Sequence, residues 1–350
     1  MATRETKLLQ TGQLAQAAAL LRAGKLVAIP TETVYGLAAD ALNPAAAAAI
    51  YAAKGRPSDN PLIVHVASVE EIPLLVRELP DALYRLAEAY WPGPMTVVLP
   101  KSERVPDETS GGLDTVAIRI PAHPVARELI RLAGTPLAAP SANLSGKPSP
   151  TCAQHCINDL SGRVDAILDG GPCGVGVEST VLTLCTNPPR ILRPGAVTLE
   201  MLRKVLADIE LDEAVFTHLA DDQKAASPGM KYKHYAPKAK VVLVHGSSEQ
   251  FRAFMADKQD AGALCFDEEE KGLCCRCVTY GNGQDAASQA QRLFDALRQL
   301  DTENFSLVYA HAAKEGGVGQ AVYNRLLRAA GFEEIVLPVV EHGMPACVDL

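Results

Sequence analysis

The chain has 350 residues, of which 48% are hydrophobic and 21% are charged, and its formal net charge is -8. This length predicts two domains, and the composition is typical of a globular protein with a substantial core. The negative charge argues against a general nucleic-acid coat protein, which would carry a basic excess. No apolar run reaches membrane-spanning length, and the first residues lack the apolar core of a signal peptide. The scattered cysteines favour a reducing, cytoplasmic location.

The first part of the chain is expected to alternate helices and short strands. Leucines at helical spacing predict a helix over 12–23, and Asn43 opens an alanine-rich helix that ends near Lys54. Thr151 and Gln154 form a capping-box pattern that predicts another helix start. Strands are expected at 26–30, 61–66, 96–100, 115–121 and 136–143, and in the segments VDAILDGG, ESTVLTL and RILRPG. Because some of them are short and hairpin-like, we predict an α/β domain around a twisted, largely antiparallel or mixed sheet.

The pattern changes near residue 207. Residues 207–239 are first acidic and then contain SPGMKYKHYAP, whose prolines and glycine indicate a linker. From residue 240 the strand segments KVVLVH, AGALCF and FSLVYAHA alternate with helical segments. This alternation predicts a smaller three-layer α/β domain with a parallel sheet.

Several common chemical motifs are absent from the sequence. It contains no GxxxxGK[ST] loop, no complete GxGxxG, no GxSxG and no HExxH. Cys274, Cys275 and Cys277 have no second ligand pair at zinc spacing, so no metal site is predicted.

Polar clusters instead mark the ends of several expected strands. Lys54 and Arg56 follow a helix C-terminus, where cations are favoured in any case, but prolines fix the next loop and present them together. His65 lies in an apolar strand, where a histidine is more often a hydrogen-bonded core residue than a ligand. Arg119 also interrupts an apolar strand and needs an anionic partner, which either an acidic side chain or a ligand could supply.

Hydroxyl-rich segments accompany these cations. They are PTETVYGL at 30–37, APSANLSGKPSPT at 139–151 and GVGVEST at 174–180, and Arg193 follows in ILRPG. Hydroxyls, backbone N–H groups and a helix N-terminus can together cradle phosphate. The set predicts a cleft for a polyanion and a small polar molecule. With no evident nucleophile or base, catalysis by positioning and charge stabilisation is expected, as in nucleotidyl transfer.

The ordered blocks PTETVYGL, KGRPSDNPLIVHV, WPGPMTVVL, VAIRIPAHP, PSANLSGKPSPT, DGG…GVESTV and ILRPG resemble those of YrdC-type threonylcarbamoyl-adenylate synthases. The second half and SPGMKYKHYAP resemble the longer form of that family. The resemblance implies a YrdC-like catalytic domain at 1–206 with a basic concave face. It also implies a linker and active-site lid at 207–239 and a Rossmann-like domain at 240–350.

The resemblance further implies an activity and its partners. L-threonine, bicarbonate and ATP, the last with Mg²⁺, would give threonylcarbamoyl-AMP and pyrophosphate. The product would serve the threonylcarbamoyladenosine (t6A) modification next to the tRNA anticodon. A downstream tRNA threonylcarbamoyltransferase complex is therefore an expected partner, with weak or indirect tRNA contact and no membrane association.

The site residues implied by the resemblance form three groups. The catalytic set is Lys54, Arg56, Ser141 and Asn143. The ATP-binding set is Arg56, Asn60, Thr115, Asn143, Thr151, Arg193 and, in the lid, Tyr235. The threonine-binding set is Thr33, His65, Arg119, Ser141 and Ser179. No protein ligand to a metal is implied.

Two other functions are compatible with parts of the sequence. An RNA-binding or ribosome-assembly role could use a basic concave face, but the net charge and the lack of an aromatic-basic strip weigh against it. A carbamoyltransferase related to larger maturation enzymes would need acylphosphatase and zinc-finger segments, which this sequence lacks.

Overall fold

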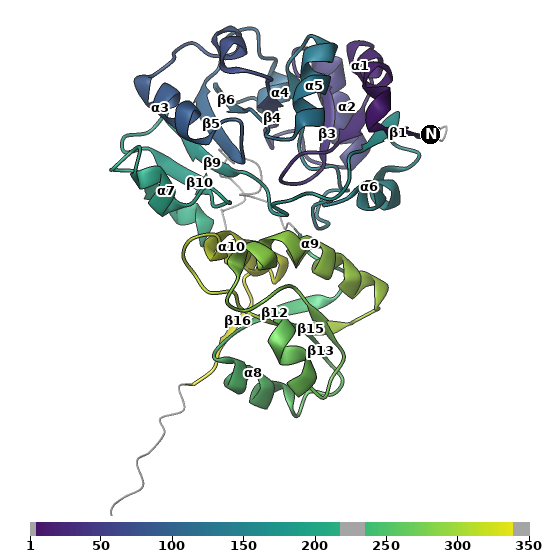
Figure 1. The fold of residues 1–350 in the computed structure, drawn as a ribbon, viewed down its shortest axis with the longest axis vertical. Coiled ribbons are helices and arrows are strands. Elements are labelled where there is room, and N and C mark those ends of the chain that lie inside the picture. Colours follow the sequence, from purple (N-terminus) through teal and green to yellow (C-terminus); the bar gives the residue numbers. More distant parts are fainter. Residues whose placement is uncertain (1–4, 218–234, 339–350) are drawn as a thin grey trace, which may run out of the picture.

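The computed structural model describes residues 5–217 and 235–338. Within them the chain builds two α/β bodies, each around its own sheet, which we call the first and the second domain (Figure 1). The larger sheet has 11 strands in the order β1-β8-β2-β3-β7-β4-β6-β5-β9-β10-β11, and the smaller one has 5 in the order β14-β13-β15-β12-β16. Of the predicted linker and lid at 207–239, residues 218–234 lie outside the described residues.

Strands and helices alternate along most of the chain. The strands of the larger sheet are β1 (Lys7–Gln10), β2 (Val27–Ile29), β3 (Gly36–Asp40), β4 (Ile63–His65), β5 (Met95–Pro100), β6 (Thr115–Arg119), β7 (Leu137–Ala138), β8 (Ala166–Asp169), β9 (Thr180–Thr183), β10 (Arg190–Arg193) and β11 (Glu210–Leu211). Its α-helices are α1 (Leu14–Arg22), α2 (Pro44–Lys54), α3 (Asp81–Tyr90), α4 (Asp107–Ser110), α5 (Pro124–Ala133), α6 (Ala153–Leu160) and α7 (Leu199–Arg203). The smaller sheet and its helices comprise β12 (Lys240–His245), α8 (Ser248–Met255), β13 (Gly262–Cys265), β14 (Cys277–Thr279), α9 (Ala286–Thr302), β15 (Leu307–His311), α10 (Gly319–Ala329) and β16 (Glu334–Val336).

The larger sheet is mixed, which confirms the predicted fold class. β4 pairs in parallel with β6, for example, whereas β5 and β6 are antiparallel. Alternate strand residues face opposite sides of a sheet. Val64 and Ile118 accordingly enter the core beneath α2 and α3, whereas Ile63 and Ala117 face the other side.

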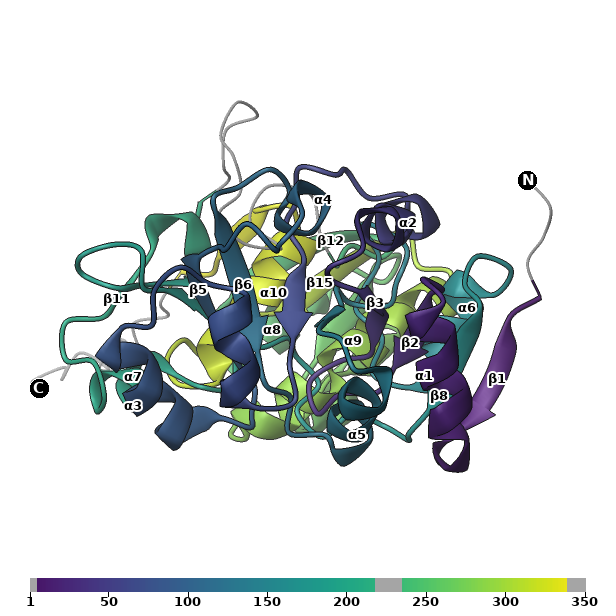
Figure 2. The same cartoon turned by 90° about the horizontal axis from the view of Figure 1, so that it is seen from above.

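That other side is only partly covered by helices of the first domain. At one end of the sheet, α1 and α5 pack side by side on residues such as Val27 and Leu168 (Figure 2). At the other end, the strands β4, β6, β5, β9 and β10 carry a smaller apolar cluster and several polar side chains. The fold thus leaves half of one sheet face for a site.

The second domain contains the predicted parallel sheet. α9 and α10 cover the face toward the first domain, and α8 covers the far face (Figure 1). Val34 and Val177 of the first domain belong to the same apolar cluster as α9 and α10. The two domains are therefore joined by continuous apolar packing and not only by the chain connection.

Some local predictions were wrong. No strand was predicted between residues 30 and 61, yet Gly36–Asp40 forms β3, because pairing with β2 and β7 outweighs the low strand propensity of an alanine-rich segment. Thr151 does not cap α6, which begins one residue later with Cys152 at the N-cap. Within the described ranges, no helix has the length and apolar character needed to cross a membrane.

Candidate active site

One cavity gathers most of the predicted site residues. The predicted residues among its lining are Thr33, Arg56, His65, Arg119, Ser141, Asn143, Ser179, Arg193 and Tyr235. Val34, Ile63, Ala139, Pro140 and Glu178 complete the wall. The space between these residues is about 550 Å³ including its open mouth.

Strand register brings two of these residues together. β4 and β6 are parallel, and His65 lies directly opposite Arg119. Thr96 of β5 is the antiparallel neighbour of Arg119. Residues directly opposite each other in a sheet point to the same face, so the three side chains form a row at the strand ends.

His65 is held as a neutral imidazole. Its Nδ1 lies 3.2 Å from the carbonyl oxygen of Ile63, which can only accept a hydrogen bond. Burial, followed by the charge of Arg119, lowers the pKa of His65 to about 3. With the proton on Nδ1, the other ring nitrogen, Nε2, is an acceptor.

Arg119 has an acidic partner from the loop between β2 and β3. Its Nη2 lies 2.6 Å from Oε1 of Glu32, and both side chains are largely shielded from solvent. The sequence left open whether an acidic side chain or a ligand would supply this partner, and Glu32 supplies it. In the same loop the Thr31 hydroxyl donates to the carbonyl of Val34, while Thr33 lines the cavity.

Two further arginines border the cavity. Arg193, at the end of β10, donates from Nε to the carbonyl of Ser179 and from Nη2 to the hydroxyl of Ser179. Arg56 donates from Nη2 to the carbonyls of Asn60 and Pro61. Burial lowers the pKa of Arg56 to about 10, and the nearby charge of Arg193 acts in the same direction. Arg56 is still a cation at neutral pH, so the cavity is suited to anions.

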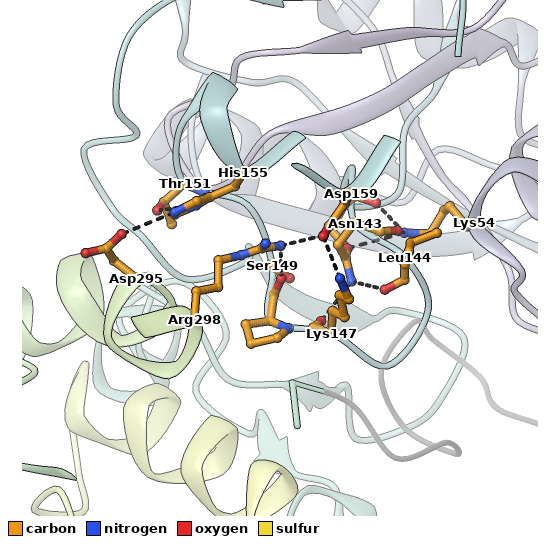
Figure 3. A network of polar contacts seen from close by, with 12 residues as sticks. Lys54, Asn143, Leu144, Lys147, Ser149, Thr151, His155, Asp159, Asp295 and Arg298 are labelled. Atoms are coloured by element: carbon orange, nitrogen blue, oxygen red, sulfur yellow. Dashed lines mark hydrogen bonds and ion pairs between the residues drawn. The ribbon is translucent and has the colours of Figure 1, made fainter. Parts of the chain in front are cut away.

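Lys54 was expected to be presented together with Arg56, but its side chain points to a neighbouring loop and not into the cavity. Its Nζ donates to the carbonyls of Ser141 and Asn143 and to Oδ1 of Asn143 (Figure 3). The Ser141 hydroxyl in turn donates to Asn143 Oδ1 over 2.6 Å. Lys54 is buried and is not among the cavity-lining residues, so it acts on the loop that carries Ser141 and Asn143.

Three predicted ATP-binding residues also lie away from the cavity wall. Thr115 begins β6, roughly 13 Å along the strand from Arg119 at ~3.3 Å per residue. Thr151 is buried, and its backbone N–H donates to Nδ1 of His155. The side-chain amide of Asn60 is buried and has no hydrogen-bond partner within the described part of the chain.

Sequence reasoning missed two charged residues of this region. Glu178 lines the cavity, and Arg325 of α10, in the second domain, forms an ion pair with Glu178. Glu178 stood inside the quoted segment GVGVEST, where an acid between valine and serine was a visible signal. Arg325 lies between apolar residues in the helical segment NRLLRAA, which gave a weaker signal.

The cavity offers little to a metal ion by itself. Within residues 5–217 and 235–338, no group of three or more His, Cys, Asp or Glu side chains could hold one. Glu178 is the carboxylate in the cavity lining, and both of its oxygens already accept hydrogen bonds, from Ser149 and Arg325. A divalent ion here would need phosphate oxygens as its main ligands.

Comparisons with known proteins give the class of protein first. Residues 19–195 match the Sua5/YciO/YrdC family model, described as "Telomere recombination". Residues 197–331 match the model described as "Threonylcarbamoyl-AMP synthase, C-terminal domain". The chain, whose first domain has a mixed sheet with a cationic cavity at its strand ends, thus belongs to the Sua5/YciO/YrdC class.

The relatives narrow this class. A threonylcarbamoyl-AMP synthase from Pyrococcus abyssi is 47% identical over 330 residues, covering 91% of this chain and 94% of its own. One from Bacillus subtilis is 46% identical, covering 91% and 93%. The crystal structure of P. abyssi Sua5 complexed with L-threonine has a TM-score of 0.87 at 42% identity, covering 95% and 99%. The chain therefore belongs to the threonylcarbamoyl-AMP synthase family, in its two-domain form.

Proposed function

We propose that this chain is an L-threonylcarbamoyladenylate synthase, a nucleotidyltransferase. It would convert L-threonine, bicarbonate and ATP to threonylcarbamoyl-AMP, pyrophosphate and water. The observation that carries the proposal is the single cavity in which Arg56, Arg119 and Arg193 meet a neutral His65. A cavity of this kind suits a polyanion and an amino acid together.

The chemistry needs charge stabilisation more than a base. Threonine's amine and bicarbonate form a carbamate with loss of water. A carbamate oxygen then attacks the α-phosphorus of ATP, and pyrophosphate leaves. Because the attacking group is already anionic, the difficulty is bringing two anions together, and preorganised cations offset that repulsion. Arg56 and Arg193 are held in place by backbone carbonyls and are suited to this task.

We assign ATP and threonine to different parts of the cavity. Arg56, Arg193 and Tyr235 would bind the ATP phosphates. The side-chain amide of Asn60, which has no hydrogen-bond partner among the described residues, supports a nucleotide contact behind them. Arg119 would bind the threonine carboxylate. The acceptor nitrogen of His65 would take a hydrogen bond from the threonine hydroxyl, so an analogue without that hydroxyl would leave the nitrogen unpaired.

Other parts of the proposal concern the setting of the reaction. Mg²⁺ would arrive with ATP as part of the substrate, since the cavity carboxylate is already engaged. The product would pass to a tRNA threonylcarbamoyltransferase complex for t6A synthesis, with tRNA contact weak or indirect. A cytoplasmic setting agrees with the cysteines of the described residues, which are free thiols.

A pyrophosphate assay tests the proposal. The full chain is incubated with ATP, Mg²⁺ and bicarbonate, with and without L-threonine, and pyrophosphate release is measured. We expect threonine-dependent release that needs no tRNA; absence of threonine dependence would reject the proposal. Arg56→Ala should lower kcat/KM by about 10²–10³-fold, the usual effect of losing one transition-state donor. Full activity in this variant would refute the assignment of Arg56.

A further inference from the structure

A buried ion pair links the second domain to the cavity wall. Nε of Arg325, in α10, lies 2.8 Å from Oε2 of Glu178, in the loop before β9. The side chain of Arg325 is 0% exposed and that of Glu178 is 8% exposed. The two residues are 147 positions apart and belong to different domains. The second domain thus places a cation directly behind a carboxylate that faces the proposed substrate cavity.

This carboxylate is ionised despite its burial. Burial alone would raise the pKa of Glu178, but the charges of Arg325 and Arg193, with hydrogen bonds from Ser149 and Arg325, hold the pKa below its ordinary value. Arg193 also lines the cavity, and Glu178 is the main group that favours its charged form. Glu178 therefore has two cations within its influence, one behind the wall and one in the cavity.

An ionised carboxylate in a phosphate site is a disadvantage unless it is neutralised. It repels phosphate oxygens, and it competes with them for Arg193. By engaging Oε2 of Glu178 from the second domain, Arg325 offsets the negative charge that causes this repulsion. Ser149 donates to Oε1, so each oxygen of the carboxylate accepts a hydrogen bond from the protein.

We propose that Arg325 is a positioning residue that keeps the cavity cationic for the phosphates of ATP: by pairing with Glu178 from the second domain, it offsets the negative charge of a carboxylate in the cavity wall. This inference rests on the proposed function, because it concerns nucleotide binding in the same cavity. It also gives the second domain a role in the reaction without placing any of its atoms on the substrate.

The surrounding packing holds Arg325 in this position. Its guanidinium carbon lies 5.7 Å from the ring centroid of Tyr235, and that ring packs on Phe294 of α9 with centroids 5.1 Å apart. Gly176 adopts a positive φ of +84°, and a Cβ there would lie 2.3 Å from the Cα of Gln291. The loop that carries Glu178 therefore lies against the backbone of α9, and the ion pair forms between two fixed surfaces.

A double-mutant cycle tests the inference with the full chain. Arg325→Met, Glu178→Gln and the double variant are compared with the wild type for the Kd of Mg·ATP by calorimetry and for KM and kcat. Arg298→Met is the matched control. Arg298 of α9 also bridges the domains, at 2.8 Å from the buried carboxylate of Asp159, but Asp159 does not line the cavity. Thermal unfolding of each variant reports on folding.

The charge argument predicts a specific pattern. Arg325→Met should weaken Mg·ATP binding at least ~10-fold, with kcat changed less, because a buried carboxylate loses its partner. Glu178→Gln should not weaken it, and the double variant should lie within about 3-fold of the wild type. Arg298→Met should lower the unfolding temperature and leave the Kd for Mg·ATP unchanged.

Other outcomes would overturn the inference. If Arg325 were only structural, the double variant would bind ATP as weakly as Arg325→Met or more weakly. If the single variant Arg325→Met did not fold, the double variant would be compared with Glu178→Gln. The inference requires these two proteins to bind Mg·ATP with nearly the same Kd. Wild-type protein that bound no Mg·ATP would remove the proposed function and the inference together. Wild-type binding with an unchanged Arg325→Met variant would remove only the inference.

Discussion

Nη2 of Arg119 lies 2.6 Å from Oε1 of Glu32, so the arginine that faces the cavity is fixed from behind by an acid of the β2–β3 loop. Within the described residues, Nε of Arg119 and Oε2 of Glu32 have no hydrogen-bond partner. The pair therefore orients the planar guanidinium without using all of its donors. Such a group can still bind a carboxylate through its remaining N–H groups.

Arg119→Lys should weaken threonine binding selectively. Lysine keeps the charge but lacks the planar fork, so it cannot bind Glu32 and a substrate carboxylate at once. We expect KM for threonine to rise ~10-fold or more, while KM for ATP changes less than about twofold. Steady-state pyrophosphate release at varied threonine measures this. Arg131→Lys, an exposed arginine paired with Glu128, is the control. Equal increases in both KM values would contradict the assignment.

Lys54→Met should reduce stability and activity together. The substitution leaves the carbonyls of Ser141 and Asn143 without their buried donor, which costs about 2–6 kcal/mol of unfolding free energy at ~1–3 kcal/mol per group. The released loop should lower kcat ~10–100-fold through lost positioning. Urea unfolding and kcat are the measurements.

A second buried lysine provides the matched control for Lys54. Lys101 donates to the carbonyl of Val105 and the hydroxyl of Ser110, far from the cavity lining. Lys101→Met should lower stability and leave kcat within about twofold. A stable Lys54→Met protein with lost activity would instead indicate that Lys54 itself contacts the substrate.

His65 should make the protein visibly less stable as the pH falls. Its pKa is about 3 in the folded protein and has an ordinary value of 6.5, so between these values only the unfolded chain binds the proton. The contribution of His65 to stability is therefore complete above pH 6.5 and is lost as the pH falls below it. Between pH 5 and 6 the slope from this one group is about 1.2 kcal/mol per pH unit.

The variant His65→Asn isolates this slope. Its unfolding free energy, measured by urea at pH 5, 6 and 7.5, should fall less steeply toward acid than that of the wild type, whatever its absolute stability. KM for threonine in the wild type should show no inflection near pH 6.5. Parallel pH profiles for the two proteins would mean that His65 titrates normally.

The linker offers a test of water exclusion. Tyr235 lines the cavity, and the backbone N–H of Ala236 donates to the carbonyl of Gly146, so the end of SPGMKYKHYAP is anchored at the site. Replacing 227–237 by a Gly/Ser segment of equal length should lower kcat ~10-fold and increase the share of threonylcarbamoyl-AMP lost to water. The ratio of intermediate to pyrophosphate measures this. If kcat and the ratio of intermediate to pyrophosphate were both unchanged, the segment would be a simple connector. A Gly/Ser replacement of residues 218–226 is the control.

Sequence motifs drew attention to the cavity-lining arginines because Arg119 and Arg193 each end an apolar strand and Arg56 follows a helix C-terminus. His65 and Arg119 could be placed near each other once β4 and β6 were recognised, although their direct register requires the sheet. The position of Lys54 could not be predicted, because a cation at a helix C-terminus can face a ligand or bind carbonyls 87 residues away. Glu178 and Arg325 were missed for a related reason: their pairing depends on how two domains meet, and no local pattern encodes that.

Among the described residues, two arginine pairs between the domains, Arg298 with Asp159 and Arg325 with Glu178, share one polarity. Each has its acid in the first domain and its cation in the second. A gene shortened to encode the first domain alone would therefore yield a protein in which Glu178, in the cavity wall, loses its arginine partner, while Asp159 keeps Lys147 as a cationic partner. Reducing this chain to a minimal enzyme should require a neutral residue at position 178 in the same step, so the modular appearance of the fold does not extend to its charges.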